Sequence, residues 1–323
     1  MSAWSRLWLD HPGCATLAEP SLVIYASSAE AGWVGLPAVA AEIAAIKHRH
    51  PSARHAFVSM GCLGLHAAIL EAQRSQAESV LIFLVESPGY YLQDMLNVAG
   101  LGVGAEGLYA VEGAATLHLV RSETVANDGC GLSMATILAK TPGPGGTLRL
   151  LEKLESVLEP LTAEPSGVDV VSFRMYSRWC DQLLQGFSRL IQAKWSNGTR
   201  LLDSYESDCH HNLTVKPVRE LAMYGASTTQ RPLVILTLGA GGRIGVLILM
   251  RGQMPQTRRR AHPPSALVAA RSGDYLKYPE PLYNCTDFRI DDAYFLDDLT
   301  ENLDPVPWQP ESLAANAVGV EGA

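Results

Sequence analysis

The residue in the sequence best suited to covalent chemistry is Cys62, in the stretch VSMGCLGLHAAILEA (residues 58–72). A short apolar run ends just before it, and apolar residues at helical spacing follow, so the sequence predicts a strand-to-helix corner. At such a corner the unpaired N–H groups and the helix dipole lower the pKa of a thiol, which favours the thiolate that attacks acyl carbonyls. A buried cysteine that serves only as a small apolar side chain fits the same position, and residue type alone leaves both interpretations open.

A second group of polar side chains lies in DCHHN, residues 208–212. Imidazoles titrate near neutral pH, so either His210 or His211, which precede Asn212, can serve as a general acid or base. A role as hydrogen-bonded loop histidines fits them equally well. Adjacent histidines seldom converge on one ion, so we predict no metal site. His66, one turn after Cys62, is expected to pack in the core or to support residues that touch the substrate.

The elements around these residues alternate between strand and helix, as in an α/β layered fold. We predict strands at 21–27, 55–60, 79–86, 112–122, 168–173 and in both arms of 232–252, and helices at 36–50, 63–76, 148–161, 179–195 and 211–225. The GAGGRIG stretch between the last two strands has the glycine content of a dinucleotide loop. It does not open a helix, however, and we predict a hairpin turn.

The strands and helices form two groups, centred near residues 60 and 240, which suggests an internal pseudo-repeat. We expect residues 1–251 to form one core, with halves at about 20–140 and 147–251 on either side of TPGPGG. In residues 252–323, prolines, an RRR run and acidic residues replace the periodic pattern. We therefore predict that this segment is an extension that lies over the core or docks to a partner.

Composition excludes several classes of function. The net charge of −8 over 323 residues argues against a general nucleic-acid binder. No apolar run reaches the roughly 18–20 residues that span a bilayer, and the first residues lack a signal-peptide layout. We therefore expect a cytoplasmic protein that binds neither membrane nor nucleic acid. The six cysteines are scattered without a CxxC pair, so neither a disulfide framework nor a zinc site is predicted.

The order of the motifs resembles the thiolase-like condensing enzymes, specifically the β-ketoacyl-acyl-carrier-protein synthase III branch. The motifs are SLVIYAS, HAFVSMGCLGLHAAILEA, SVLIFLVES and VEGAATLHLVR, and LTLGAGGRIGVLILMRG is similar to the closing hairpin of that family. The resemblance covers roughly residues 20–251. It implies a thiolase-like layered αβαβα fold built from two pseudo-related halves.

The resemblance also implies roles for individual residues. Cys62 matches the position that takes the acyl group as a thioester, and the backbone N–H groups of Cys62 and Gly241 would form the oxyanion hole. Gly239 and Arg174 are expected to line the oxyanion or substrate-binding site. Asn212 is similar to the Asn of the HGN segment, which helps to hold a malonyl carbonyl during decarboxylation.

One departure from the family changes the expected reaction. The family has a catalytic His in a PHQAN-like stretch after a strand of its second half, whereas here VDVVSF continues into RMYSRW, with Arg174 near the expected place. An arginine is permanently charged and cannot act as a base near neutral pH. We therefore expect no decarboxylative carbon–carbon bond formation in the family's usual way.

Three functions remain open at this stage. The first is an acyltransferase of ketosynthase III type that passes an acyl group from Cys62 to an oxygen, nitrogen or sulfur acceptor, in secondary-metabolite biosynthesis of polyketide or fatty-acid type. The second is a decarboxylative β-ketoacyl synthase in which His210 or His211 replaces the usual His. The third is a non-catalytic partner of an active ketosynthase homologue.

The resemblance implies an acyl-CoA or acyl-carrier-protein thioester as the substrate and no separate cofactor. It also implies a homodimer, or a heterodimer with a ketosynthase homologue. The family normally has several dozen residues before its SLVIYAS-like strand, and this sequence has about twenty. We therefore expect the segment 252–323, or a partner subunit, to cover the surface that those residues would protect.

Overall fold

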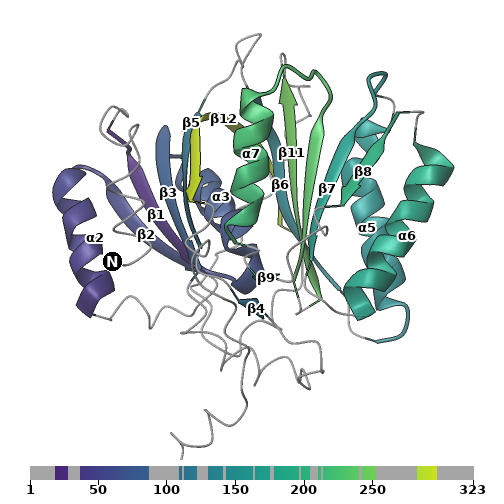
Figure 1. Cartoon of the computed structure of the whole chain (residues 1–323), viewed down its shortest axis with the longest axis horizontal. Helices are drawn as coiled ribbons and strands as arrows, with labels where there is room; N and C mark the ends of the chain where they lie inside the picture. The colour runs from purple at the N-terminus through teal and green to yellow at the C-terminus, as the bar shows by residue number, and fades with distance from the viewer. Residues whose placement is uncertain are drawn as a thin grey trace, which may run out of the picture.

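The computed structural model describes residues 19–27, 37–86, 109–110, 113–121, 130–140, 143–162, 164–174, 178–195, 198–203, 210–211, 214–239, 242–251 and 282–296. Within these ranges ten strands form one mixed sheet, and two short strands pair separately (Figure 1). In the same ranges, no helix has the length and apolar character that a membrane crossing requires.

The large sheet runs in the spatial order β2 (Arg54–Ser59), β1 (Leu22–Ser27), β3 (Ser79–Glu86), β5 (Gly113–Arg121), β12 (Leu282–Leu296), β6 (Cys130–Ala139), β11 (Arg243–Arg251), β10 (Leu233–Gly239), β7 (Asp169–Arg174) and β8 (Arg200–Asp203). The short pair consists of β4 (Tyr109–Ala110) and β9 (His210–His211). The helices are α2 (Pro37–Arg49), α3 (Gly64–Ser75), α5 (Gly146–Leu158), α6 (Arg178–Lys194) and α7 (Lys216–Ala226), with 3-10 turns η3 (Gly61–Leu63) and η4 (Glu159–Leu161). The last helix begins at Lys216 rather than at residue 211 as predicted, because His211 pairs in β9.

The strand pairings repeat across the sheet. In one half β1 pairs in parallel with β2 and β3, and β3 pairs antiparallel with β5. In the other half β7 pairs in parallel with β8 and β10, and β10 pairs antiparallel with β11. The order β2-β1-β3-β5 therefore corresponds to β8-β7-β10-β11. This correspondence confirms the two pseudo-related halves predicted from the sequence.

Strands β12 and β6 join the halves at the centre of the sheet. Each is antiparallel to the other and to the outer strand beside it, β5 or β11. In the second half, the central strand β6 comes before α5 and β7 in the chain. By the same pattern, the central strand of the first half should come before β1. Its place is filled instead by residues from after β11. Part of the segment predicted as an extension is thus a central strand, in which the Phe288 ring is fully buried 4.8 Å beneath the Arg121 guanidinium.

The helices form layers on both faces of the sheet. All residues of β1 and β10 are buried, as expected for strands covered on both sides. On β10, Leu233 and Ile235 pack in a core with α3 and α7, whereas Val234, Leu236 and Leu238 pack with α5 and α6. The first of these cores also holds residues of β1 and β3, so α3 and α7 lie between the two halves of the sheet. Figure 1 shows α2 on the outer side of the first half, which completes the predicted αβαβα layers.

Candidate active site

Cys62 lies at the predicted corner between strand and helix. β2 ends at Ser59, Gly61 reverses the chain direction with a φ of +52°, and Cys62 follows in η3, which leads directly into α3. The positive φ of Gly61 is a conformation that residues with a Cβ rarely adopt. Cys62 is a buried thiol, 7% exposed. The strand-to-helix corner predicted from the sequence is confirmed.

The end of β10 packs directly against this corner. A Cβ added to Gly239 would lie 3.9 Å from the Cβ of Cys62 and 3.9 Å from the Cγ of Leu63. The hairpin of β10 and β11, confirmed by their antiparallel pairing, therefore brings the end of β10 beside Cys62. Gly241, predicted to donate to an oxyanion, lies outside the described residues.

The start of α7 reaches the same corner from the second half. The hydroxyl of Thr214, which is fully buried, donates a hydrogen bond to the carbonyl oxygen of Gly61 at 3.2 Å. A Cβ on Gly64 would lie 2.7 Å from the Cγ2 of Thr214, so glycine at the first position of α3 permits this close approach. The two central helices thus begin at one point, and Cys62 lies there.

Thr214 also limits where the predicted histidines can lie. His211 is three residues before Thr214, so their Cα atoms are separated by at most about 11 Å. The backbone of His210 and His211 forms β9, which pairs in parallel with Tyr109 and Ala110 of β4. Asn212 lies between β9 and Thr214, outside the described residues. The contact of Thr214 with Gly61 brings the residue two positions after Asn212 to the Cys62 corner.

Arg174 lies at the same end of the sheet. It is the last residue of β7, and its Cα pairs with that of Leu238, the residue before Gly239. The carboxyl ends of parallel neighbours meet at one edge, as in α/β folds generally. The described backbone therefore brings together three predicted residues from distant parts of the sequence, namely Cys62, Arg174 and Gly239.

His66 is buried one turn beyond Cys62, as expected for a residue that packs in the core. Its ring is 0% exposed and packs so tightly on β11 that a Cβ on Gly245 would lie 2.5 Å from it. Burial lowers the pKa of His66 to about 3, so the imidazole is neutral at pH 7. Within the described part of the chain, neither ring nitrogen has a hydrogen-bond partner.

Sequence reasoning did not identify Thr214 or Thr237 as residues of interest. Thr214 lies two residues after Asn212 and inside the helix predicted at 211–225, so no local signal distinguished it. Thr237 interrupts the apolar run LVILTLG two residues before Gly239. Its hydroxyl is fully buried and has no hydrogen-bond partner among the described residues. A polar residue inside an otherwise apolar central strand was the signal for it.

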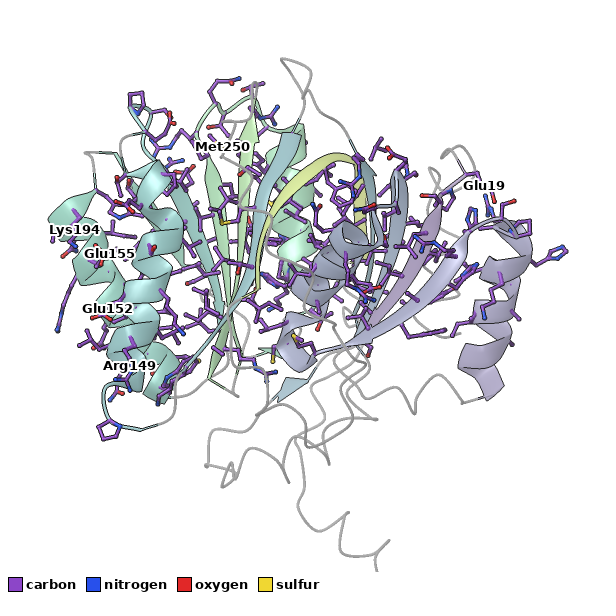
Figure 2. All side chains as sticks on the ribbon, turned by 180° about the vertical axis from the view of Figure 1, so that it is seen from behind. Glu19, Arg149, Glu152, Glu155, Lys194 and Met250 are labelled. Carbon is purple, nitrogen blue, oxygen red and sulfur yellow. The ribbon has the colours of Figure 1, made fainter. Side chains whose placement is uncertain are left out.

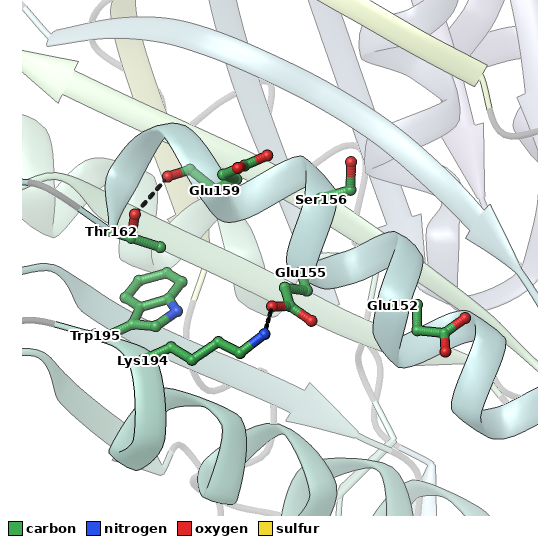
Figure 3. A pocket seen from close by; sticks show the side chains of 7 residues that line it. All are labelled: Glu152, Glu155, Ser156, Glu159, Thr162, Lys194 and Trp195. Carbon is green, nitrogen blue, oxygen red and sulfur yellow. Dashed lines mark hydrogen bonds and ion pairs between the residues drawn. The ribbon is translucent and has the colours of Figure 1, made fainter.

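An open surface hollow of about 430 Å³ lies elsewhere, between α5 and α6 (Figure 3). Glu152, Glu155, Glu159 and Lys194 supply its charged side chains, and Lys194 forms an ion pair with Glu155. Figure 2 shows Glu152, Glu155 and Lys194 together on this outer helical layer. Because α5 and α6 cover the face of β10 opposite to α3, the hollow is not part of the Cys62 site.

In the ranges described by the structure, no three His, Cys, Asp or Glu side chains lie together so that they could hold a metal ion. The arrangement around Cys62 instead consists of a thiol, glycine-rich backbone and hydroxyl groups. Such a set suits acyl transfer through a covalent thioester, because backbone N–H groups near a nucleophile can stabilise an oxyanion.

These features define the class of fold to which the chain belongs. Two pseudo-related halves, a central pair of helices and a cysteine before the first of them make up a thiolase-like fold. Comparisons with known proteins agree with this assignment and confirm, at the level of the fold, the resemblance stated from the sequence. No protein-family model and no curated protein sequence matches the chain.

Two of the similar solved structures are single-residue variants of OleA from Xanthomonas campestris. One has a TM-score of 0.52 and 14% identity, over 77% of this chain and 82% of its own. The other has a TM-score of 0.51 and 14% identity, over 77% and 80%. The 3-oxoacyl-(acyl carrier protein) synthase III FabH from Pseudomonas aeruginosa has a TM-score of 0.47 and 12% identity, over 79% and 85%. Identities this low establish the fold, and the reaction is argued from the site.

Proposed function

We propose that the protein is an acyltransferase of ketosynthase III type that carries the acyl group as a thioester on Cys62. The observation that supports this most is the corner itself, where Gly239 and Thr214 pack around a thiol that precedes a central helix. The thiolase-like fold and its similarity to OleA support the proposal.

The proposed reaction has two balanced steps. The Cys62 sulfur attacks the carbonyl of an acyl-CoA or acyl-carrier-protein thioester, its proton passes to the departing sulfur, and the free carrier thiol leaves. A hydroxyl, amine or thiol of the acceptor then attacks the acyl-Cys62 thioester, and the Cys62 thiol is restored. Backbone N–H groups near Gly239 are the candidates to stabilise the oxyanion of each tetrahedral intermediate.

A second candidate function is decarboxylative condensation with a malonyl thioester. The observation that favours it is the hydrogen bond from Thr214, two residues after the HHN segment, to Gly61 at the Cys62 corner. His210 or His211 would then supply the imidazole, and Asn212 would hold the malonyl carbonyl. No CO₂ is released in the first proposal, so the two candidates differ in a measurable product.

Intact-mass spectrometry after incubation with a series of acyl-CoA donors tests the proposal. We expect an increase equal to one acyl group in the wild-type protein and none in Cys62→Ala. Cys130→Ala is the matched control, since Cys130 is equally buried and burial raises the pKa of its thiol to about 12. It should be acylated like the wild type.

The acylated protein is then treated with malonyl-CoA or with small alcohols, amines and thiols. Release of the acyl group to a small nucleophile supports the acyltransferase. Discharge by malonyl-CoA with formation of CO₂ supports condensation and overturns the first proposal. The absence of an adduct with every CoA and carrier-protein donor would contradict both and favour the non-catalytic partner subunit.

A further inference from the structure

Two polar side chains in the core beside Cys62 lack hydrogen-bond partners. They are His66 on α3, with both ring nitrogens, and Thr237 on β10, with its hydroxyl; the structure gives neither a partner within the described residues. Both are 0% exposed. A buried polar group without a partner costs roughly 1–3 kcal/mol, so a core seldom retains two of them together without a use.

The two groups lie close to each other on one face of the sheet. Thr237 and Gly245 are paired across β10 and β11, and side chains at such paired positions lie about 5 Å apart on one face of the sheet. The His66 ring lies where a Cβ on Gly245 would be, within 2.5 Å of that position. The imidazole and the Thr237 hydroxyl are therefore neighbours in the layer between the halves of the sheet.

This polar pair is also aligned with the nucleophile. Gly239, which faces Cys62, is two residues after Thr237 and on the same face of β10. Alternate residues of a strand are about 7 Å apart. An acyl group attached to the Cys62 sulfur and running along this face would reach the pair after a few carbon atoms.

We infer that His66 and Thr237 bind an oxygen of the acyl group, so that the preferred donors carry a hydroxyl or keto group a few carbons from the thioester. This inference rests on the proposed acyl transfer to Cys62. A neutral imidazole has one donor and one acceptor nitrogen, and a threonine hydroxyl can both donate and accept. Together they can donate hydrogen bonds to a substrate hydroxyl and accept one from it, and they can donate hydrogen bonds to a keto oxygen. An unsubstituted acyl chain would leave both groups unpaired, as they are in the described structure.

A permanently bound water molecule that bridges the two groups is the alternative, since such waters commonly satisfy buried polar atoms. In that case the pair would contribute to stability but not to the choice of substrate. The two cases differ in whether the substrate oxygen changes the rate of acylation, because a site built to pair with an oxygen discriminates against analogues that lack it.

The test compares acylation rates of Cys62 by hexanoyl-CoA, 3-hydroxyhexanoyl-CoA and 6-hydroxyhexanoyl-CoA, followed by intact mass. In the wild type we expect the 3-hydroxy donor to react at least about tenfold faster than hexanoyl-CoA. The 6-hydroxy donor, whose hydroxyl lies beyond the pair, should show no such advantage. Thr237→Val removes the hydroxyl at nearly constant shape and should bring the ratio of the first two rates close to one.

Two variants separate loss of recognition from loss of folding. Thr237→Ser keeps the hydroxyl and should retain the preference. Thr136→Val removes an equally buried threonine hydroxyl on β6, where Thr136 pairs with Val246 and lies on the α5 and α6 side of the sheet. It should leave the rate ratio unchanged.

The inference is overturned if the wild type reacts equally fast with hexanoyl-CoA and 3-hydroxyhexanoyl-CoA, or if the preference survives in Thr237→Val. Either outcome supports the bridging water instead. In both cases an adduct still forms, so the proposed acyl transfer stands. No adduct from any of the three donors overturns the inference together with the proposed function.

Discussion

At the scale of single residues, glycines determine how closely the parts of the site can approach. Gly64 admits Thr214, Gly239 faces Cys62, and Gly245 makes room for the His66 ring. All three contacts join α3 and its preceding turn to the second half of the protein. A side chain at Gly64 or Gly245 would have to displace a neighbour in a close-packed interior, which typically costs about 1–3 kcal/mol, whereas a Cβ at Gly239 would meet Cys62 at an ordinary contact distance.

Replacement of Gly245 by alanine tests this interpretation. The new Cβ would meet the His66 ring at 2.5 Å, so we expect Gly245→Ala to lower the free energy of unfolding by about 1–3 kcal/mol in urea titrations. In a His66→Ala background the same change should cost little, because the clash is gone.

Gly225→Ala is the control for this prediction. Among the described residues, nothing lies within 4 Å of a Cβ at Gly225, which is in α7 and exposed. Alanine there should be neutral or should stabilise the helix by up to about 1 kcal/mol. Equal costs for Gly245→Ala in both backgrounds would show that the His66 ring is not the group displaced.

At the scale of elements, Asp169 ties together three segments of the second half. Its carboxylate accepts hydrogen bonds from Arg200 Nε at 2.8 Å and from Arg231 Nε at 2.9 Å. Burial acts to raise the pKa of Asp169, but the two guanidinium groups outweigh it and the pKa lies below its usual value. The interaction fixes β8 and Arg231, two residues before β10, to the start of β7, and so aligns the strands that end at Arg174 and Gly239.

The lowered pKa predicts how stability depends on pH. The charged carboxylate stabilises the fold fully above its unfolded-state pKa of about 3.9, and this contribution is lost as pH falls through the lower folded-state value. We expect Asp169→Asn to cost about 2 kcal/mol at pH 7, measured by urea unfolding, with a difference that shrinks steadily below about pH 5.

Glu155→Gln is the matched control, since it removes a carboxylate from the exposed ion pair with Lys194. It should change stability by less than about 1 kcal/mol at pH 7. A cost for Asp169→Asn that stays constant down to about pH 3 would mean that the charge of Asp169 is not what stabilises the strands.

Elements whose pattern is local were predictable, and elements defined by distant partners were not. The apolar runs of β1, β3, β10 and β11 and the periodic helices α3 and α6 were confirmed close to their predicted bounds. β6, β8 and β12 were not assigned as strands. β12 mixes aromatic residues with the acidic Asp287, Asp291 and Asp292, so no regular alternation is visible in its sequence. Its place follows from pairing with β5 and β6, which lie more than a hundred residues earlier in the chain.

The features of the candidate site also divide into those that were predictable from local sequence and those that were not. The Cys62 corner and the hairpin beside it were predictable, because each is marked by residues adjacent in sequence. The contact of Thr214 with Gly61 and the approach of His66 to Thr237 depend on how α3 and α7 pack between the halves of the sheet. No spacing within either segment encodes that packing, so these partners could not be predicted from the sequence.

At the scale of the whole molecule, the two halves are held together by a strand from the segment 252–323. β12 pairs with β5 along one part of its length and with β6 along the other, and it buries Phe288 between them. Removing it would leave two unpaired strand edges in the middle of the protein, and such edges promote aggregation.

Truncation after Arg251 is therefore expected to lower the melting temperature by more than about 10 °C or to give insoluble protein, measured by scanning calorimetry and size-exclusion chromatography. The point variant Phe288→Ala should cost about 3–5 kcal/mol while the chain keeps its length. A truncated protein that melts and elutes like the full chain would contradict a central role for β12.

The position of β12 also affects how the protein can form during translation. Ribosomes make a chain from its amino end, so every other described strand is synthesised before residues 282–296. Until then the nascent protein has all the described strands except β12, and β5 and β6 lack this partner. Completion of the sheet must wait for this late strand, and during that interval the edges of β5 and β6 are open to wrong pairing.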